Sequence, residues 1–191
     1  MQTTPLSQLL ESIRAGHQFR SRIDPEPEGE YRIVQGKDIN RSRKIVVDEL
    51  TRVEQRHIKD PERNCLRPGE VLFMARGTRL MATVVDETIP PQTVAVSSFH
   101  VLVPNTDLLL PEYLVWAIND ETAQSWLVSN ISGTTIPMIT QKTLLSLPLP
   151  TPSIQSQHRF VQLLRLAEKE RELAEQLYKT RQQMLRGILQ S

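Results

Sequence analysis

The sequence predicts an α+β fold: a mixed, β-rich domain with short helices over residues 1–152, then one long coiled-coil-type helix over residues 153–191. Three observations predict this fold. Short apolar runs rich in β-branched and aromatic residues recur between turn signals in the first part. Prolines at alternate positions, in Leu147-Pro148-Leu149-Pro150-Thr151-Pro152, exclude a helix there and mark a boundary. Beyond Ser153 there is no proline, and Gly187 is the only glycine.

The first element is predicted to be a short helix that ends at Gly16. Thr4 can cap this helix and Pro5 suits its first turn. Four apolar residues would share one of its faces: Leu6, Leu9, Leu10 and Ile13. Residues 24–30 hold two prolines and a glycine between four acidic residues, so we expect a solvated loop there.

Strands are then predicted from short apolar runs, and turn signals separate them. Pro68-Gly69 makes a turn before the third run, and Pro90-Pro91 breaks the chain before the last. The predicted strands run from Tyr31 to Gln35, Ile45 to Val47, Val71 to Ala75, Met81 to Val85 and Phe99 to Val103.

Helical periodicity follows the last strand. Pro111 opens a helix whose apolar face is formed by Leu114, Val115, Ala117 and Ile118. A second helical stretch runs from about Asp120 to Val128. A polar loop, residues 132–135, precedes a short helix that Thr140 caps and that carries Leu144 and Leu145.

Residues 154–188 are predicted to form one helix with Ser153 as its N-cap, roughly 50 Å long. Its apolar positions recur at steps of three and four, which is a coiled-coil seam interrupted by Glu170. The predicted dimerisation residues on this seam are Leu163, Leu166, Leu173, Leu177, Met184 and Ile188. A helix with one apolar stripe needs a partner to bury it. The helix could fold back on the first domain, but its length and the proline linker favour an extended partner helix.

Basic residues are unevenly distributed, although the net charge is only +1. Residues 1–85 carry a net charge of +3, residues 86–141 have no Lys or Arg and carry −6, and residues 142–191 carry +4. This distribution permits a polyanion-binding surface. An ordinary solvated surface is the alternative that charge alone leaves open.

Several classes of protein and site are disfavoured. The single cysteine, Cys65, excludes an internal disulfide framework and an all-cysteine zinc site. The four histidines lack metal-ligand spacing, and there is no Gly-rich phosphate loop, Gly-x-Ser-x-Gly elbow or strong acidic cluster. We therefore expect no enzymatic activity, no cofactor and no metal. We see neither a membrane span nor a secretory signal, so the expected location is the cytoplasm.

Three segments together resemble a known family. They are residues 12–20, residues 66–78, and residues 132–139 continuing through Leu144 and the prolines at 148 and 150 to Gln157 and the long helix. In this order they resemble the specificity subunit of type I restriction–modification enzymes. The third segment is the most specific of them, and the resemblance covers nearly the whole chain.

The resemblance implies a target-recognition domain that grips one half of a split double-stranded DNA sequence. It also implies that the helix spaces this domain from a second one and docks the methyltransferase (modification) subunits, in a complex that includes a restriction subunit. Typical members carry two domain–helix units, whereas this sequence carries one. The departure suggests a half-length subunit that pairs with itself as a homodimer, and a truncated or split gene product remains the alternative.

Side chains that can read base edges or grip phosphates gather in predicted loops. Gly77 would let the backbone approach a phosphate closely. Lys44, Ser97 and Ser132 stand beside these candidates. The predicted DNA-binding residues are Gln18, Arg20, Arg22, Lys37, Asn40, Arg41, Arg43, Arg76, Gly77, Thr78, Arg79, Ser98, His100, Thr134 and Thr135. Each could instead be an ordinary solvated loop residue, and residues 132–135 could simply be a turn that ends a helix.

Two further hypotheses stay open. The chain could be a non-nucleic-acid scaffold that dimerises or recruits partners through its helix. The chain could also be a nuclease, in which case the pure chain would cleave DNA in the presence of a metal ion. Affinity for DNA that falls steeply with salt, together with preference for a split sequence, distinguishes the specificity subunit from the scaffold.

Overall fold

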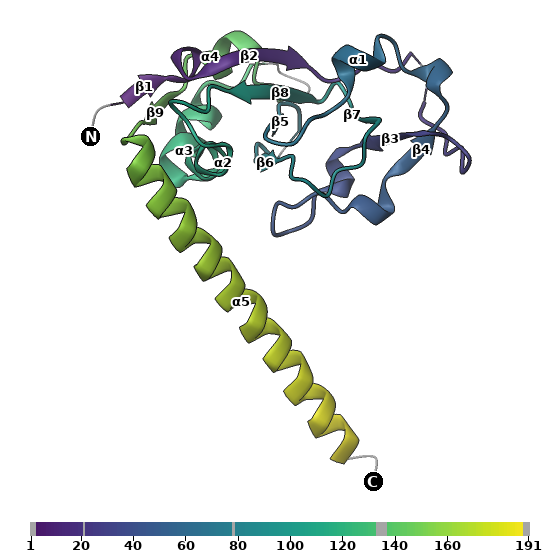
Figure 1. Ribbon diagram of the computed structural model, residues 1–191, viewed down its shortest axis with the longest axis vertical. Helices are drawn as coiled ribbons and strands as arrows, with labels where there is room; N and C mark the ends of the chain where they lie inside the picture. The colour runs from purple at the N-terminus through teal and green to yellow at the C-terminus, as the bar shows by residue number, and fades with distance from the viewer. Residues whose placement is uncertain (1–2, 21, 78, 133–136, 189–191) are drawn as a thin grey trace. The chain divides into compact units, whose positions relative to one another are not determined.

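The computed structural model describes residues 3–20, 22–77, 79–132 and 137–188 (Figure 1). The chain divides into two compact units, Met1–Pro152 and Ser153–Ser191. The first unit holds β-sheets and short helices, and the second is one long helix. The predicted α+β fold is therefore confirmed.

Among the described residues, the larger sheet has the strand order β2-β8-β5-β6, with neighbours antiparallel. The central strand β5 is buried along its whole length, so both of its faces are covered by other parts of the domain. The strands are β2 (Leu10–Ala15), β5 (Val71–Met74), β6 (Ala82–Val84) and β8 (Phe99–Pro104). The strands predicted near residues 71–75, 81–85 and 99–103 are confirmed.

A helix supports the outer strand of this sheet. α2 (Pro111–Asn119) contacts β6 and β5. At its end, the Asn119 side chain accepts from the Ala82 N–H at 3.0 Å and donates to the Ala82 carbonyl at 2.9 Å. One side-chain amide thus satisfies both backbone groups of Ala82 on the edge strand.

The smaller sheet has the order β4-β3-β7 among the described residues. It consists of β4 (Thr51–Val53), β3 (Tyr31–Val34) and β7 (Thr93–Ala95), with β3 antiparallel to β4 and parallel to β7. Tyr31, Ile33, Val53, Ile58 and Val94 form its buried core cluster. The strand predicted from Tyr31 is confirmed.

The predicted first helix is wrong. Its place is taken by β1 (Thr3–Pro5), a 3-10 turn over Leu6–Gln8, and β2. Residues 10–15 pair with β8 instead of forming local hydrogen bonds, so a tertiary ladder overrides the helical leucine spacing. Gly16 is not a helix C-cap: a Cβ there would lie 2.2 Å from the Val96 carbonyl oxygen. This glycine therefore allows the chain to pass close to the backbone at Val96.

The strand predicted from Ile45 to Val47 is also wrong. Ile45 forms only an isolated bridge with Ile39, and a 3-10 turn follows at Val47–Glu49. Residues 45 and 46 lie between the turn at Asn40–Arg43 and the 3-10 turn at Val47–Glu49. The extended segment between these turns is too short to pair with a neighbouring strand. The apolar side chains of Ile45 and Val47 still pack against a second buried cluster, which includes Val34, Leu72 and Phe99, and this packing explains the apolar pattern.

The short helices predicted after residue 110 are confirmed, and α2 begins at Pro111 as expected. α3 (Glu121–Ser129) begins after Asp120, whose carboxylate accepts from the Thr122 N–H at 3.1 Å. α4 (Gln141–Leu145) is capped by Thr140, whose hydroxyl accepts from the Thr143 N–H at 3.1 Å. The structure adds α1 (Pro61–Asn64), which the sequence reading did not predict.

The proline-rich segment is extended, as predicted. β9 (Pro148–Pro150) pairs antiparallel with β1, with Leu149 opposite Thr4. Only short edge pairing of this kind tolerates prolines at two of three positions. The segment therefore ends the first unit by closing its two chain ends on each other.

The second unit is α5 (Ile154–Ile188), with the predicted bounds. The Ser153 hydroxyl accepts from the Ser156 N–H at 3.4 Å, a long contact at its start. Four leucines and a methionine of the seam are each more than half exposed: Leu163, Leu166, Leu173, Leu177 and Met184. At about 100° per residue they fall within a stripe roughly 80° wide. The side chain of Ile188 lies outside the described residues. None of the described helices is long and apolar enough to cross a membrane.

One ion pair inside the first unit is well placed to stabilise it. Arg14 on β2 donates to both carboxylate oxygens of Glu70, at 2.7 and 2.8 Å, and Glu70 also accepts from the Arg67 N–H at 3.0 Å. The side chains of Arg14 and Glu70 are only 18% and 8% exposed. We expect Arg14→Ala to lower the free energy of unfolding by about 3 kcal/mol, because a nearly buried carboxylate would lose its partner.

Urea denaturation of the full chain measures this change. The matched control is Arg22→Ala, since Arg22 and Asp24 form a 3.9 Å pair whose side chains are 92% and 83% exposed. We expect that variant to stay within about 0.5 kcal/mol of wild type. Equal stability of the two variants would contradict a structural role for the Arg14–Glu70 pair.

Candidate nucleic-acid interface

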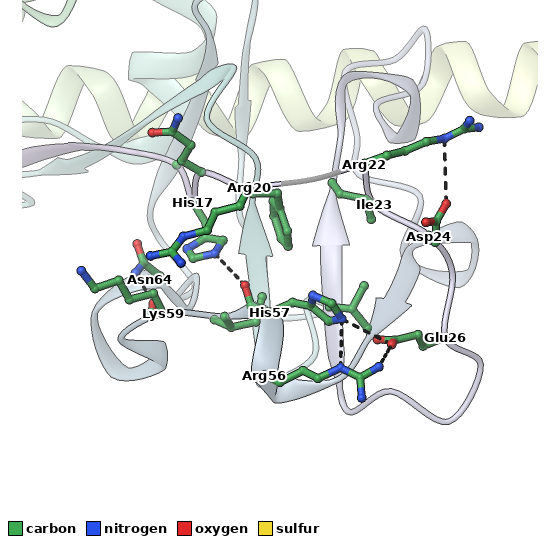
Figure 2. A pocket seen from close by; sticks show the side chains of 15 residues that line it. His17, Arg20, Arg22, Ile23, Asp24, Glu26, Arg56, His57, Lys59 and Asn64 are labelled. Atoms are coloured by element: carbon green, nitrogen blue, oxygen red, sulfur yellow. Dashed lines mark hydrogen bonds and ion pairs between the residues drawn. The ribbon is translucent and has the colours of Figure 1, made fainter.

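A groove of about 680 Å³ lies beside the smaller sheet, where the chain leaves β2 (Figure 2). Gly16 donates to the Phe99 carbonyl at 2.9 Å, and His17 donates to the Ala95 carbonyl at 2.7 Å. These bonds lead the chain from the larger sheet onto the smaller one, where Phe19 and Ile23 pack against the core cluster. The polar residues on either side of Phe19, Gln18 and Arg20, are left exposed to solvent along the groove.

We call this surface the basic groove. It brings together three of the predicted DNA-binding residues and adds three that the sequence reading missed. Its polar residues are Gln18, Arg20, Arg22, Arg56, Lys59 and Asn64, with His17, Asp24, Glu26 and His57 also in its lining. Cations therefore outnumber carboxylates in the groove.

Arg20 and Lys59 are the cations free to meet an external anion. Both are exposed, and neither has an ion-pair partner within the part of the chain that the structure describes. In Figure 2 their side chains extend at the same end of the groove as Asn64. Arg22 also lines the groove but lies away from these three residues. It forms a 3.9 Å ion pair with Asp24, and this exposed contact contributes little energy.

Arg56 is different, because it is held by two carboxylates. One terminal nitrogen of Arg56 contacts the Glu26 carboxylate. The other terminal nitrogen lies 3.0 Å from the Glu54 carboxylate. The Glu54 N–H donates to Glu26 at 2.7 Å, and His57 Nε2 lies 3.3 Å from Glu26 Oε1. The backbone bond from Glu54, together with His57 and Arg56, lowers the pKa of Glu26 below its ordinary value. Glu26 is therefore a carboxylate at neutral pH.

The acidic loop over residues 24–30 is thus more than a solvated turn. Glu26 and Glu30 accept from the backbone N–H groups of Glu54 and Gln55, at 2.7 and 3.3 Å. Gly29 is buried so tightly that a Cβ would lie 2.3 Å from the Val53 carbonyl carbon. The loop is consequently fixed against β4 and carries the carboxylates of Asp24 and Glu26 into the groove.

His17 has a structural setting. Its Nε2 lies 3.0 Å from the His57 carbonyl oxygen, and its ring meets Phe19 edge to face with centroids 4.7 Å apart. The ring is buried and joins the floor of the groove to the turn that carries Arg56. His17 therefore positions the groove.

A second basic surface forms where two predicted segments meet. Arg76 and Arg79 are exposed on the connection between β5 and β6, as the sequence predicts. Arg76 bridges to Met138, and Met138 bridges to Ser132. The arginine loop thus lies against the ends of the polar loop, although Thr78, Thr134 and Thr135 are outside the described residues.

Gly77 does not offer its amide to a phosphate in this arrangement. It has a φ of +106°, which explains a glycine at this position. Its N–H already donates to the Pro137 carbonyl at 3.1 Å. The two flanking arginines remain the candidates here.

We expect Arg76→Ala and Arg79→Ala to weaken DNA binding without changing the melting temperature, because both side chains are exposed. A base-reading arginine would relax specificity at one position, while a phosphate-gripping one would lower the salt slope by about one unit. Titrations with target and scrambled duplexes at several salt concentrations separate these cases. Unchanged affinity and slope in both variants would make the loop an ordinary solvated turn.

The predicted residues between Lys37 and Lys44 form a tight exposed turn. Lys37, Asn40, Arg41 and Arg43 are all exposed, and Arg43 has a φ of +59°. The Asn40 side-chain oxygen accepts from the Lys44 N–H at 3.0 Å, so this oxygen serves the turn itself. The turn presents arginines to solvent, separately from the residues that line the basic groove.

His100 and Ser98 are less accessible. His100 is 8% exposed and its Nε2 lies 2.9 Å from the Ile139 carbonyl oxygen. Burial lowers the pKa of His100 below its ordinary value, and the charge of Arg76 lowers it further. Ser98 is half-buried and its carbonyl accepts from the Ala75 N–H. The side chains of His100 and Ser98 are therefore poorly placed to contact DNA.

Arg56, Lys59 and Asn64 were not predicted, because the candidate residues lie at the ends of predicted helices and strands or in the loops between them. β4, which precedes this segment, was not predicted. A signal was nonetheless present, because residues 52–67 contain five cations: Arg52, Arg56, Lys59, Arg63 and Arg67. Within the described residues, no group of three His, Cys, Asp or Glu side chains could hold a metal ion.

Comparison with known proteins now defines the class. A family model described as the type I restriction modification DNA specificity domain matches residues 1–180. The chain therefore belongs to this family, and the predicted resemblance is confirmed. No curated protein sequence gives a significant match.

Solved structures share the fold at low sequence identity. The HsdS subunit from Thermoanaerobacter tengcongensis superposes with a TM-score of 0.67 at 21% identity, covering 90% of this chain and 43% of that one. A chain from a structure concerning complex assembly and conformational transition of the type I R-M system gives 0.68 at 19% identity, with 91% and 44% covered. The type I S subunit from M. genitalium gives 0.59 at 15% identity, with 87% and 38% covered. This chain spans less than half the length of each.

Proposed function

We propose that this chain is the DNA-reading subunit of a type I restriction–modification complex, in which the first unit binds one half of a split target. The observation that carries the proposal is the basic groove, a concave surface with two unpaired exposed cations in a chain that belongs to the DNA specificity family. Cations without acidic partners attract phosphates, and polar side chains beside them can meet base edges.

The chain acts without catalysis of its own. It directs methyltransferase and restriction subunits to the target, and it does so in the cytoplasm. The low net charge of the chain does not oppose this function, because the cations gather in the part that forms the groove.

The second unit explains how a chain with one recognition domain could recognise a target in two halves. A long helix with an exposed apolar stripe is stabilised when a second helix covers that stripe. We infer that two copies of this chain pair through α5, which supplies the second recognition domain that longer members of the family encode in one polypeptide. Identical domains on a two-fold axis then read identical half-sites in opposite orientation.

DNA binding by the purified full-length chain tests the proposal. Duplexes are first selected from a random-sequence library, and affinity for the selected and scrambled duplexes is then measured at several salt concentrations. We expect a steep fall in affinity with salt and a preference of at least about 1,000-fold for the selected sequence. Weak binding that is indifferent to both salt and sequence would favour a scaffold that does not bind nucleic acid.

A further inference from the structure

The groove cations differ in how firmly the protein holds them. Arg56 contacts Glu26 and Glu54 through its two terminal nitrogens, and its Nε lies 3.3 Å from His57 Nε2. Figure 2 shows Arg56, His57 and Glu26 converging. Arg20 and Lys59 have no such partner among the described residues. The guanidinium of Arg56 is therefore fixed in advance, whereas the other two cations are free to follow a phosphate.

Of the two carboxylates that hold Arg56, the one of Glu26 is itself fixed. The side chain of Glu26 is 22% exposed, and its backbone N–H donates to the Arg52 carbonyl at 2.9 Å. The Glu54 N–H donates to the Glu26 carboxylate at 2.7 Å, so the two loops are joined directly. Arg56 itself is 64% exposed. The arrangement presents an open guanidinium on a partly buried support.

The charge of this cluster opposes a phosphate contact. One guanidinium and two carboxylates sum to −1 when His57 is neutral, so the cluster does not attract an anion. A contact from Arg56 to DNA is therefore better matched to a neutral group than to a phosphate. The edges of bases in the major groove are such groups, and they are read by fixed donors and acceptors.

We propose that Arg56, positioned by Glu26 and Glu54, reads a G·C base pair in the major groove, while Arg20 and Lys59 grip phosphates. This inference rests on the proposed function. Guanine presents two acceptors, O6 and N7, which an arginine can meet with two N–H groups. The cytosine of the same pair presents an N4 amino donor, which a neighbouring carboxylate can accept. The cluster thus offers complements to both bases of one pair.

The test uses full-length chain and the duplex selected from a random library, with each guanine replaced in turn by 7-deazaguanine, which lacks the N7 acceptor. We expect the wild-type chain to lose about tenfold in affinity at one guanine of each half-site. Arg56→Ala should lose about 10- to 100-fold for the selected duplex, should keep the wild-type salt slope, and should be insensitive to 7-deazaguanine at that position.

Two further variants separate the roles. Glu26→Gln keeps the size of the side chain and removes one negative charge from the groove. We expect this variant to bind the scrambled duplex more tightly than wild type does. The ratio of its affinities for the selected and the scrambled duplex should therefore be smaller. Lys59→Ala is the control for a phosphate contact, and it should weaken both duplexes alike and lower the salt slope by about 0.9 for each recognition domain bound.

Thermal melting of each variant confirms that folding is retained. The inference is overturned if Arg56→Ala keeps wild-type affinity, because Arg56 would then make no contact with DNA. It is also overturned if the variant binds both duplexes equally more weakly with a lower salt slope, because Arg56 would then contact a phosphate. Sensitivity to 7-deazaguanine that survives in Arg56→Ala also overturns it. If wild-type chain prefers no duplex at all, the proposed function fails and this inference fails with it, whereas the other outcomes leave the proposed function intact.

Discussion

Placing aspartates at two seam positions of α5, Leu173→Asp with Leu177→Asp, is expected to convert a dimer into monomers. Both leucines are more than half exposed in the single chain and lie on the same stripe. Burying a leucine contributes about 1.5–3 kcal/mol, and the two changes would remove four leucines from one dimer and bring four carboxylates together. Light scattering at tens of micromolar gives the oligomeric state directly.

The matched control places two aspartates on the opposite side of the same helix, Lys179→Asp with Arg186→Asp. Both positions are exposed and lie away from the stripe, so this variant should remain dimeric. A wild-type chain that is monomeric at tens of micromolar would contradict the homodimer. The stripe would then have to be covered by a different protein.

Removing the two unpaired cations of the basic groove, Arg20→Ala with Lys59→Ala, is expected to weaken binding to every duplex by roughly 30-fold per recognition domain at 0.15 M salt. The estimate assigns one phosphate to each cation, with about 0.9 counterions released per contact. The salt slope should fall by about 1.8 for each domain bound. The preference between selected and scrambled duplexes should change little, because phosphates carry no sequence information.

A control variant removes the same charge elsewhere, Lys142→Ala with Arg181→Ala, and both positions are exposed and outside the groove. It should bind DNA as wild type does. If the two double variants lose affinity equally, overall charge governs binding and the groove is not the interface. The exposed arginines of the 37–44 turn and the 76–79 loop would then become the leading candidates.

The elements that the sequence predicted well are those determined by local signals. α5 could be placed to the residue because prolines precede it, Ser153 can cap it, and no breaker interrupts it. Thr140 and Pro111 likewise mark helix starts through their own chemistry. The apolar runs of β5 and β8 are long enough for a strand to be recognised.

The elements that were wrong or missed depend on distant parts of the chain. Leu10–Ala15 carries helical leucine spacing at its start, yet its residues pair with β8 some ninety positions away. β4 and β7 have three residues each, too few for an alternating pattern to be recognised. Gly16 acts as a close contact with Val96 and not as a helix end, and only the tertiary structure reveals this.

The candidate site follows the same division. Gln18, Arg20 and Arg22 were predicted from side-chain chemistry in a loop. Arg56 and Lys59 were not, because the crossing from β2 to the smaller sheet brings residues 16–24 alongside residues 53–64, and no sequence pattern encodes that approach. The pairing of Arg56 with Glu26, thirty positions apart, has the same origin.

We have proposed that two copies of this chain read a split DNA sequence on behalf of a methyltransferase. The decisive experiment expresses the chain with the products of its neighbouring genes and maps the methylated positions across the host genome. We expect a methylated motif made of two identical half-sites in inverted orientation with an unread spacer of fixed length. We also expect methylation of this motif to be lost when Arg20 and Lys59 are both replaced by alanine. An asymmetric or uninterrupted motif, or a methylation pattern that does not depend on the chain, would contradict the proposal.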